Sequence, residues 1–322
     1  GQLVYYRDKP SRFEAWDLDR QTLGTGRIVR EKATITPFRE GSHRAGLKVL
    51  RKIGERSKGE ISFYLEAGSP LLRVSMKIDW QDKYALLKFL MPTGYLATNA
   101  RFGVPYGSVL RPQVVNGPVS EAMWEVPFSR WLAVFDEGEN EGLFAVTEAK
   151  YGATVRDGSI GISLVRSPKN VGYDGMSIAW PPHLSRLKGT AGHTDLCSHD
   201  IRMAFGRYHG NLLRGQHPAS LADTLFTNPV PYKGKAYASA IESLEGGETL
   251  IPAWARPLDS TSWLLRFHEV GGRRGSTKIR TASGWQSAHC TVTGQAEGVE
   301  GRETVVDFQP YQIVSVLFRK AK

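Results

Sequence analysis

The sequence has little of what several common protein classes require. Its 322 residues include only 2 cysteines, Cys197 and Cys290, so at most one disulfide could form and a disulfide-dependent fold is not expected. It contains no run of roughly 18 apolar residues, which argues against a transmembrane helix, and its first residues do not follow the pattern of an export signal. We therefore expect a globular protein without a membrane partner, in a reducing compartment such as the cytoplasm.

Local catalytic motifs are missing as well. The sequence contains no GxSxG nucleophile elbow, no phosphate-binding GxxxxGK[ST], and no GxGxxG between a strand and a helix. An enzyme of the usual kinds would therefore need a site assembled from residues that are far apart in the chain.

Positive charge is in excess, with 42 Lys and Arg against 32 Asp and Glu and a formal net charge of +10. Such an excess can indicate an anionic partner. Here it is scattered through the chain, and residues 113–150 contain only Arg130 and Lys150 as cations. Because scattered charges are typical of a solvated surface, we expect no nucleic-acid partner.

Strand and turn patterns, by contrast, are abundant. In residues 71–80, apolar residues from Leu72 to Trp80 alternate with polar ones, as in a half-buried antiparallel strand. Asp157-Gly158 lies between two apolar stretches and predicts a hairpin turn, because both residues tolerate a positive φ. Further strands are predicted at 59–65, 84–89, 142–146, 159–165, 201–206, 263–269 and 313–319.

Helical periodicity is almost absent. One helix is predicted from about Pro218 to Phe226, followed by a linker-like stretch at 230–235. We therefore predict an all-β chain with two domains. Residues 1–232 would form a large antiparallel β-supersandwich and residues 233–322 a small β-sandwich.

Three local clusters could carry function. If residues 193–199 form a strand, the side chains of His193, Asp195, Cys197 and His199 project to one face, and all four are Zn²⁺ ligand types. Positions two apart on a strand are separated by about 6.6 Å, so only two of them could easily reach one ion. Hydrogen-bonded polar residues at a strand end or cleft are the favoured interpretation.

The other two clusters also allow both a functional and a structural interpretation. Asp17 and Asp19 could be the paired acids of a glycosidase, although acids flanking a tryptophan in a short segment are more often turn and cap residues. The 8 tryptophans include Trp124, Trp131 and Trp180, which could stack on sugar rings but are expected mainly to fill the core.

Eight short motifs follow one another along nearly the whole chain. They are DKP at 8–10 with FEAWDLD at 13–19, RFGVPYGSVLRP at 101–112, EVPFSRW at 125–131, KYG at 150–152 with SLVRSP at 163–168, TDLCSH at 194–199, LADTLFTNP at 221–229, LLRFHEVGGRRG at 264–275 and FQPY at 308–311. In this order they resemble the C-terminal β portion of glycoside hydrolase family 38, the zinc-dependent retaining α-mannosidases.

The resemblance implies a galactose-mutarotase-like supersandwich that completes and supports a sugar-binding cleft. The zinc ligands and the nucleophilic aspartate of such enzymes lie on an N-terminal barrel, whose motifs are not found in these 322 residues. We therefore expect no cofactor in this chain, zinc in the missing catalytic domain, and no hydrolytic activity of the chain alone. That the first residue is Gly1, inside a predicted strand, fits a part missing upstream.

The expected partners are the catalytic domain of the same enzyme and α-mannosides or other glycans, and a homo-oligomer is possible. An arginine of the β portion helps shape the sugar pocket in the family, and the SLVRSP motif makes Arg166 the candidate for that role. Asp195 and His199 match the TDLCSH motif and are predicted to bind substrate near Arg166. No catalytic or metal-binding residue is predicted in this chain. The alternative is a free-standing, non-catalytic carbohydrate-binding β-sandwich protein.

Overall fold

The structure is a computed structural model and describes residues 1–10, 15, 17–169, 192–210, 217–228, 231, 233–234, 239–298 and 300–321. Trp16, Trp180 and Tyr232 lie outside these ranges. The chain divides into two compact units, each described by itself. The first unit comprises Gly1–Ala100, Pro112–Gly138 and Gly142–Arg207, and the second comprises Arg101–Arg111, Glu139–Glu141 and Tyr208–Lys322. The domain boundary predicted at 232 and 233 stays a prediction.

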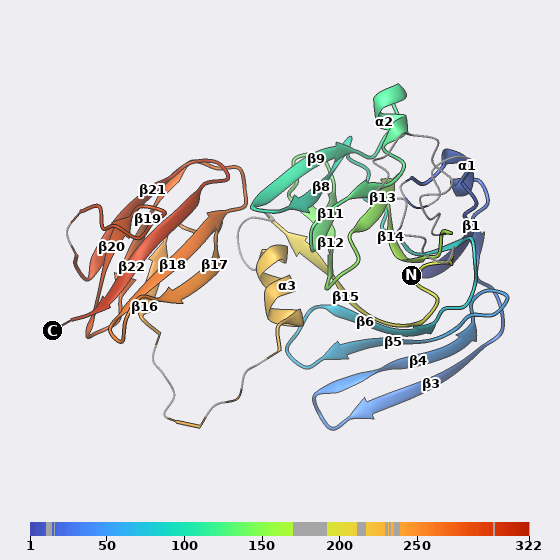
Figure 1. The fold of residues 1–322 in the computed structure, drawn as a ribbon, viewed down its shortest axis with the longest axis horizontal. Coiled ribbons are helices and arrows are strands. Elements are labelled where there is room, and N and C mark those ends of the chain that lie inside the picture. Colours follow the sequence, from blue (N-terminus) through green and yellow to red (C-terminus); the bar gives the residue numbers. More distant parts are fainter. Residues whose placement is uncertain are drawn as a thin grey trace, which may run out of the picture. The chain divides into compact units, whose positions relative to one another are not determined.

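The largest sheet has nine strands. In spatial order they are β3 (Ala33–Glu40), β4 (Arg44–Lys52), β5 (Lys58–Glu66), β6 (Leu72–Asp79), β15 (Ser198–His209), β12 (Glu141–Thr147), β11 (Trp131–Phe135), β8 (Asn99–Val104) and β9 (Gly107–Pro112). Figure 1 shows β3 to β6 running side by side, and their pairing is antiparallel. The alternation predicted for β6 is confirmed, because Val74, Met76 and Ile78 are buried while Lys77 is exposed.

A second sheet has six strands. In order they are β10 (Val126–Pro127), β13 (Gly152–Arg156), β14 (Ser159–Arg166), β7 (Ala85–Pro92), β1 (Gln2–Arg7) and β2 (Arg27–Ile28). The predicted hairpin turn is confirmed between β13 and β14, where Arg156 pairs with Ser159. Asp157 and Gly158 have φ values of 48° and 69°, as the turn requires.

The two sheets of the first unit are joined by aromatic packing. The ring of Phe89 on β7 has its centroid 6.4 Å from that of Phe63 on β5 and 5.5 Å from that of Phe205 on β15. Fully burying one such side chain stabilises the fold by about 1.5–3 kcal/mol. Inward-facing residues of both sheets therefore form one core, as expected for a β-sandwich.

Helices are short: α1 (Arg20–Leu23), α2 (Pro118–Ala122) and α3 (Pro218–Phe226). The bounds predicted for α3 are confirmed. Its first residue is Pro218, which fits the first helical turn because that position needs no N–H partner. The ring of His217 caps the helix, with the backbone N–H of Ala219 donating to its Nδ1 at 3.2 Å.

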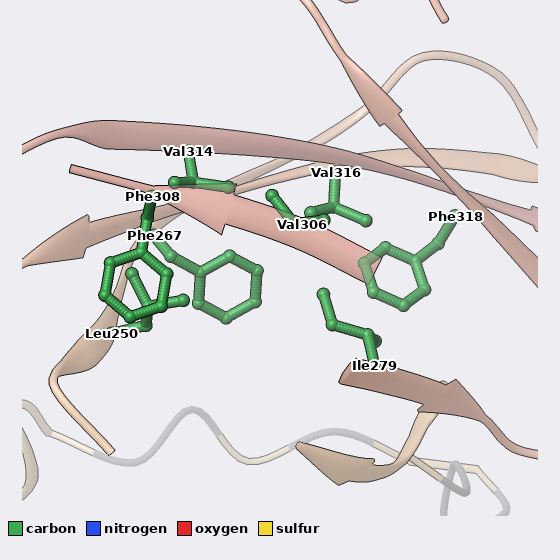
Figure 2. Packing of buried hydrophobic residues seen from close by; sticks show 8 residues of the cluster. All are labelled: Leu250, Phe267, Ile279, Val306, Phe308, Val314, Val316 and Phe318. Atoms are coloured by element: carbon green, nitrogen blue, oxygen red, sulfur yellow. The ribbon is translucent and has the colours of Figure 1, made fainter. Parts of the chain in front are cut away.

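The strands from β16 onward, which belong to the second unit and are coloured orange to red in Figure 1, form two further sheets. One contains β16 (Ile241–Glu245), β19 (Gly275–Thr281) and β21 (Glu303–Phe308), and the other contains β17 (Leu250–Pro257), β18 (Ser262–Glu269), β22 (Ile313–Lys320) and β20 (Trp285–Cys290). Apolar side chains from both sheets meet in the core shown in Figure 2: Leu250, Phe267, Ile279, Val306, Phe308, Val314, Val316 and Phe318. The all-β fold class predicted from the sequence is confirmed.

Both cysteines are free thiols. Cys197 is exposed, whereas Cys290 is buried and its burial raises the pKa of its thiol to about 11. Among the residues described above, no helix is long and apolar enough to cross a lipid bilayer.

Candidate functional site

Arg166 is the last residue of β14 and lies opposite Leu86 of β7. Its Nε donates a hydrogen bond to Oδ2 of Asp8 at 2.6 Å, and its Nη2 donates to Oδ1 at 3.4 Å and to the carbonyl of Asp17. The side chain of Asp8 has no exposed surface, while that of Arg166 is 23% exposed. A buried carboxylate is costly without such a partner, so the guanidinium fastens the N-terminal segment to the end of β14.

The backbone around Asp8 is fixed by two further hydrogen bonds. The N–H of Asp8 donates to the carbonyl of Tyr84 at 2.7 Å, and the N–H of Tyr84 donates to the carbonyl of Ser167 at 3.0 Å. Tyr84 has a φ of 51°, which is uncommon for a residue with a bulky side chain. Strained residues of this kind are often found at functional sites.

Residues 193–199 do not form one strand. β15 begins only at Ser198, and Asp195 lies in the left-handed region with a φ of 57°. The continuous strand that would carry all four potential ligands on one face is therefore wrong. The segment turns back on itself instead, because Nε2 of His199 donates to the carbonyl of Asp195 at 2.8 Å and lies 3.5 Å from Sγ of Cys197.

The fold places this turn against the segment that follows Arg166. His193 forms a backbone bridge with Lys169, and the N–H of Thr194 donates to the carbonyl of Pro168 at 3.1 Å. Nδ1 of His193 donates to the carbonyl of Ser167, also at 3.1 Å. Its ring meets that of Tyr84 edge to face, with 4.4 Å between the centroids. The SLVRSP and TDLCSH motifs thus lie beside each other.

The KYG motif joins the same region through Lys150. Burial lowers the pKa of its ammonium group, and the charges of Asp195 and Cys197 oppose that shift. Three motifs that are separate in the sequence therefore come together in the first unit. The substrate-binding roles predicted for Arg166, Asp195 and His199 stay predictions.

A polar cluster around the buried side chain of Lys88 was not expected from the sequence. Lys88 lies two residues from Leu86 on β7, so both point to the same face of the sheet. Nζ of Lys88 donates to Glu125 and, at 2.6 Å, to Oγ1 of Thr154, while Oγ of Ser163 donates to Glu125 at 2.5 Å. The only signals in the sequence are a lysine inside an apolar strand and the acid of the EVPFSRW motif.

The environment of this cluster is shaped by a glycine and by burial. A Cβ at Gly152 would lie 2.9 Å from Oε1 of Glu125, so a glycine leaves room for the carboxylate there. The side chain of Lys88 is only 3% exposed. Burial, together with the charge of Glu125, raises the pKa of the nearby Tyr6.

The remaining candidates have local structural roles. Oδ1 of Asp17 accepts from the N–H of Leu18 at 2.8 Å. Asp19 occupies the N-cap position of α1, but its side chain makes no capping hydrogen bond and instead accepts from Nε2 of Gln21 at 3.1 Å. Trp131 is buried in the core, and Nε1 of Trp124 donates to the carbonyl of Leu18 at 2.8 Å.

Potential metal ligands do not cluster in the described part of the chain. Within those ranges, no three side chains of His, Cys, Asp or Glu lie close enough together to hold a metal ion, so these residues do not fit a zinc site.

The geometry defines an all-β protein of two sandwiches, in which the SLVRSP and TDLCSH motifs and Lys150 lie near the end of β14. A family model described as the glycosyl hydrolases family 38 C-terminal domain matches residues 1–172, which is more than half of the chain. The chain belongs to this family.

Individual relatives agree with that assignment. The chain is similar to the mouse alpha-mannosidase 2C1, with 24% identity over 331 residues that cover 98% of this chain and 30% of the mouse protein. The human alpha-mannosidase 2C1 is 28% identical over 170 residues, which cover 52% of this chain and 16% of the human protein. The chain thus spans less than a third of the length of these relatives.

A solved structure shows the same fold. The crystal structure of an alpha-mannosidase from Enterococcus faecalis V583 matches 99% of this chain and 38% of that protein, with a TM-score of 0.71 and 14% sequence identity. At this identity the likeness establishes the architecture and not the function.

Proposed function

We propose that the chain is the C-terminal β part of a zinc-dependent, retaining α-mannosidase. The carrying observation is the match of residues 1–172 to the family 38 C-terminal domain, extended by the mouse relative over 98% of the chain. Because the chain spans 30% of that relative, we assign the zinc and the nucleophile to a preceding part of the polypeptide. Retention would proceed through a covalent glycosyl intermediate formed on that part.

In this proposal the β part completes and supports the sugar-binding cleft, and Arg166, Asp195 and His199 contribute to its wall. The observation that supports this role is that the side chains of Arg166 and His199 are held in place by hydrogen bonds. Arg166 is held by a fully buried carboxylate, and His199 is held by the carbonyl of Asp195. Groups fixed in this way lose little entropy when a ligand binds.

A cytoplasmic location is part of the same proposal. The free thiols of Cys197 and Cys290 support it, because unpaired cysteines persist in reducing compartments.

Assays of α-mannosidase activity test the proposed division of roles. The 322-residue chain is expected to release no 4-nitrophenol from 4-nitrophenyl α-mannoside, whereas a longer polypeptide that includes the preceding part is expected to do so and to lose activity when zinc is chelated. Activity of the 322-residue chain by itself would overturn the division.

A second pair of measurements concerns Arg166. In the longer polypeptide, Arg166→Lys is expected to raise KM more than it lowers kcat, because lysine cannot reproduce the two-point contact with Asp8. Arg280→Lys, at an exposed position in the second unit, is the control and should leave both constants unchanged. Micromolar binding to a glycan array by the 322-residue chain, without activity in the longer polypeptide, would instead favour the carbohydrate-binding alternative.

A further inference from the structure

A cleft of about 660 Å³ lies in the first unit. Its walls come from β1, β2, the loop between β4 and β5, and the loop between β6 and β7. Five cationic side chains line it: Arg7, Lys9, Arg27, Arg56 and Lys83. The volume is in the range of small-molecule sites.

The negative charge in the cleft does not balance these cations. Only two lining residues are acidic, Glu55 and Asp82. Asp82 is buried, and its carboxylate accepts hydrogen bonds from the backbone N–H groups of Glu55 at 2.9 Å and Ser57 at 3.0 Å, and from the hydroxyl of Ser57. The carboxylate oxygens of Asp82 thus accept hydrogen bonds from the wall of the cleft and not from the cationic side chains.

The cations themselves are mostly without acidic partners. In the described part of the chain, no ion pair involves Arg7, Lys9, Arg56 or Lys83, whereas Arg27 contacts Glu31 at 3.1 Å. Some arginines elsewhere in the described chain do have carboxylate partners, as in the pairs Arg44–Glu66, Arg202–Glu148 and Arg280–Glu303. A concave surface that concentrates unbalanced charge of one sign focuses the field on an ion of the opposite sign.

Aromatic side chains supply a second kind of contact. The guanidinium of Arg27 lies 4.6 Å from the ring centroid of Tyr5, and Nζ of Lys9 lies 5.9 Å from that of Tyr84. The phenol of Tyr5 is protonated at neutral pH, as in any tyrosine, and can donate a hydrogen bond there. Burial, aided by Asp82 and Glu55, raises its pKa further, to about 12.

The frame of the cleft is rigid on two sides. The hydrogen bonds to Asp82 hold the loop of residues 55–57, and the backbone bonds to Asp8 and Ser167 hold Tyr84 in its left-handed conformation. A frame held before binding spends little free energy on ordering when a ligand arrives.

We propose that this cleft binds the phosphate group of a phosphorylated sugar. A phosphate monoester carries a charge of roughly −1.5 to −2 at neutral pH and offers three acceptor oxygens, which suits a cleft lined by several guanidinium and ammonium groups. The tyrosine rings offer apolar surface to the sugar. The inference goes beyond the mannosidase proposal, and only the choice of a mannosyl probe below rests on that proposal.

Isothermal titration of the chain with methyl α-mannoside 6-phosphate, methyl α-mannoside and inorganic phosphate tests the inference. The phosphorylated sugar is expected to bind at least about tenfold more tightly than either of the other two. The variant Arg7→Gln/Arg56→Gln should weaken its binding by about tenfold or more, because each charged hydrogen bond contributes a large share of the affinity. Both residues are exposed, so the fold should be retained, and circular dichroism verifies this.

A matched control removes the same charge elsewhere. Arg273→Gln/Arg274→Gln changes two exposed arginines of the second unit and should alter the affinity by less than about twofold. Equal losses in the two double variants would overturn the site and leave only a general charge effect. Undetectable binding of the phosphorylated sugar, or equal binding of methyl α-mannoside or of inorganic phosphate, would overturn the proposed ligand.

Discussion

Arg166 and Asp8 are 158 positions apart in the sequence, yet Nε of the arginine lies 2.6 Å from Oδ2 of a carboxylate with no exposed surface. This contact joins the first strand of the chain to the end of β14. Backbone hydrogen bonds link Asp8 to Tyr84 and Tyr84 to Ser167, so these two residues are held beside the ion pair. Arg166 therefore has a structural role whether or not it also contacts a sugar.

The first prediction concerns this ion pair. Arg166→Gln leaves the carboxylate of Asp8 buried without its charged partner, so the free energy of unfolding should fall by about 3 kcal/mol in urea denaturation. Arg202→Gln serves as the control, because the Arg202–Glu148 pair is 42% and 35% exposed and its loss should cost less than about 1 kcal/mol. Equal losses in the two variants would contradict the structural role of Arg166.

The second prediction concerns Lys88 and Glu125. Lys88→Met leaves the partly buried carboxylate of Glu125 without its cation and should destabilise the protein by about 3 kcal/mol, whereas adding Glu125→Gln should recover at least about 1 kcal/mol of that loss. The exposed pair Lys48–Glu60 provides a parallel double-mutant cycle with little coupling. Equal coupling energies in the two cycles would contradict a strong interaction between Lys88 and Glu125.

The third prediction compares two turn glycines. Gly158 and Gly68 both have positive φ values, 69° and 74°, but only at Gly158 would a Cβ meet an atom, the carbonyl oxygen of Tyr95 at 2.7 Å. Gly68→Ala should cost about 1 kcal/mol through strain alone. Gly158→Ala should cost at least about 2 kcal/mol, because the hairpin must also shift. Thermal unfolding of both variants measures the difference, and equal melting temperatures would argue against the clash.

The fourth prediction concerns pH. Burial, together with the charges of His268 and Arg101, lowers the pKa of His217 from 6.5 to about 3 in the folded protein. Between these two pH values the unfolded chain binds the proton and the folded chain does not, so stability should decrease as the pH falls from 6.5 toward about 3.

Urea titrations at several pH values measure that loss. His217→Asn keeps a side chain that can cap α3 but removes the titrating group, so its stability should depend less steeply on pH over the same interval. An unchanged dependence in this variant would mean that other groups are responsible.

Local patterns predicted much of the fold correctly. The alternation in residues 71–80 predicted β6, the pair Asp157-Gly158 predicted the turn between β13 and β14, and the proline that begins α3 agreed with its helical spacing. Each of these depends on the conformational preferences of adjacent residues, which can be read from the sequence. The strand considered for residues 193–199 does not form, because Asp195 adopts a left-handed conformation that the sequence does not indicate.

The candidate site was less predictable. Motif order pointed to Arg166, but nothing in the sequence indicates that Asp8 is its partner or that Lys88 reaches Glu125 across 37 residues. The basic cleft was likewise hidden, because its cations appear in the sequence as scattered single charges. Such groupings depend on which strands pair and in which register.

The sequence alone thus determined the all-β character of this protein, the positions of many strands and turns, and the resemblance to a glycoside hydrolase family. These follow from the local conformational preferences of residues and from the order of motifs. Tertiary structure decided which charges are neutralised and which remain open to a ligand. The physical reason is that the cost of a charge depends on its burial and on partners within a few ångströms, and long-range strand pairing sets both.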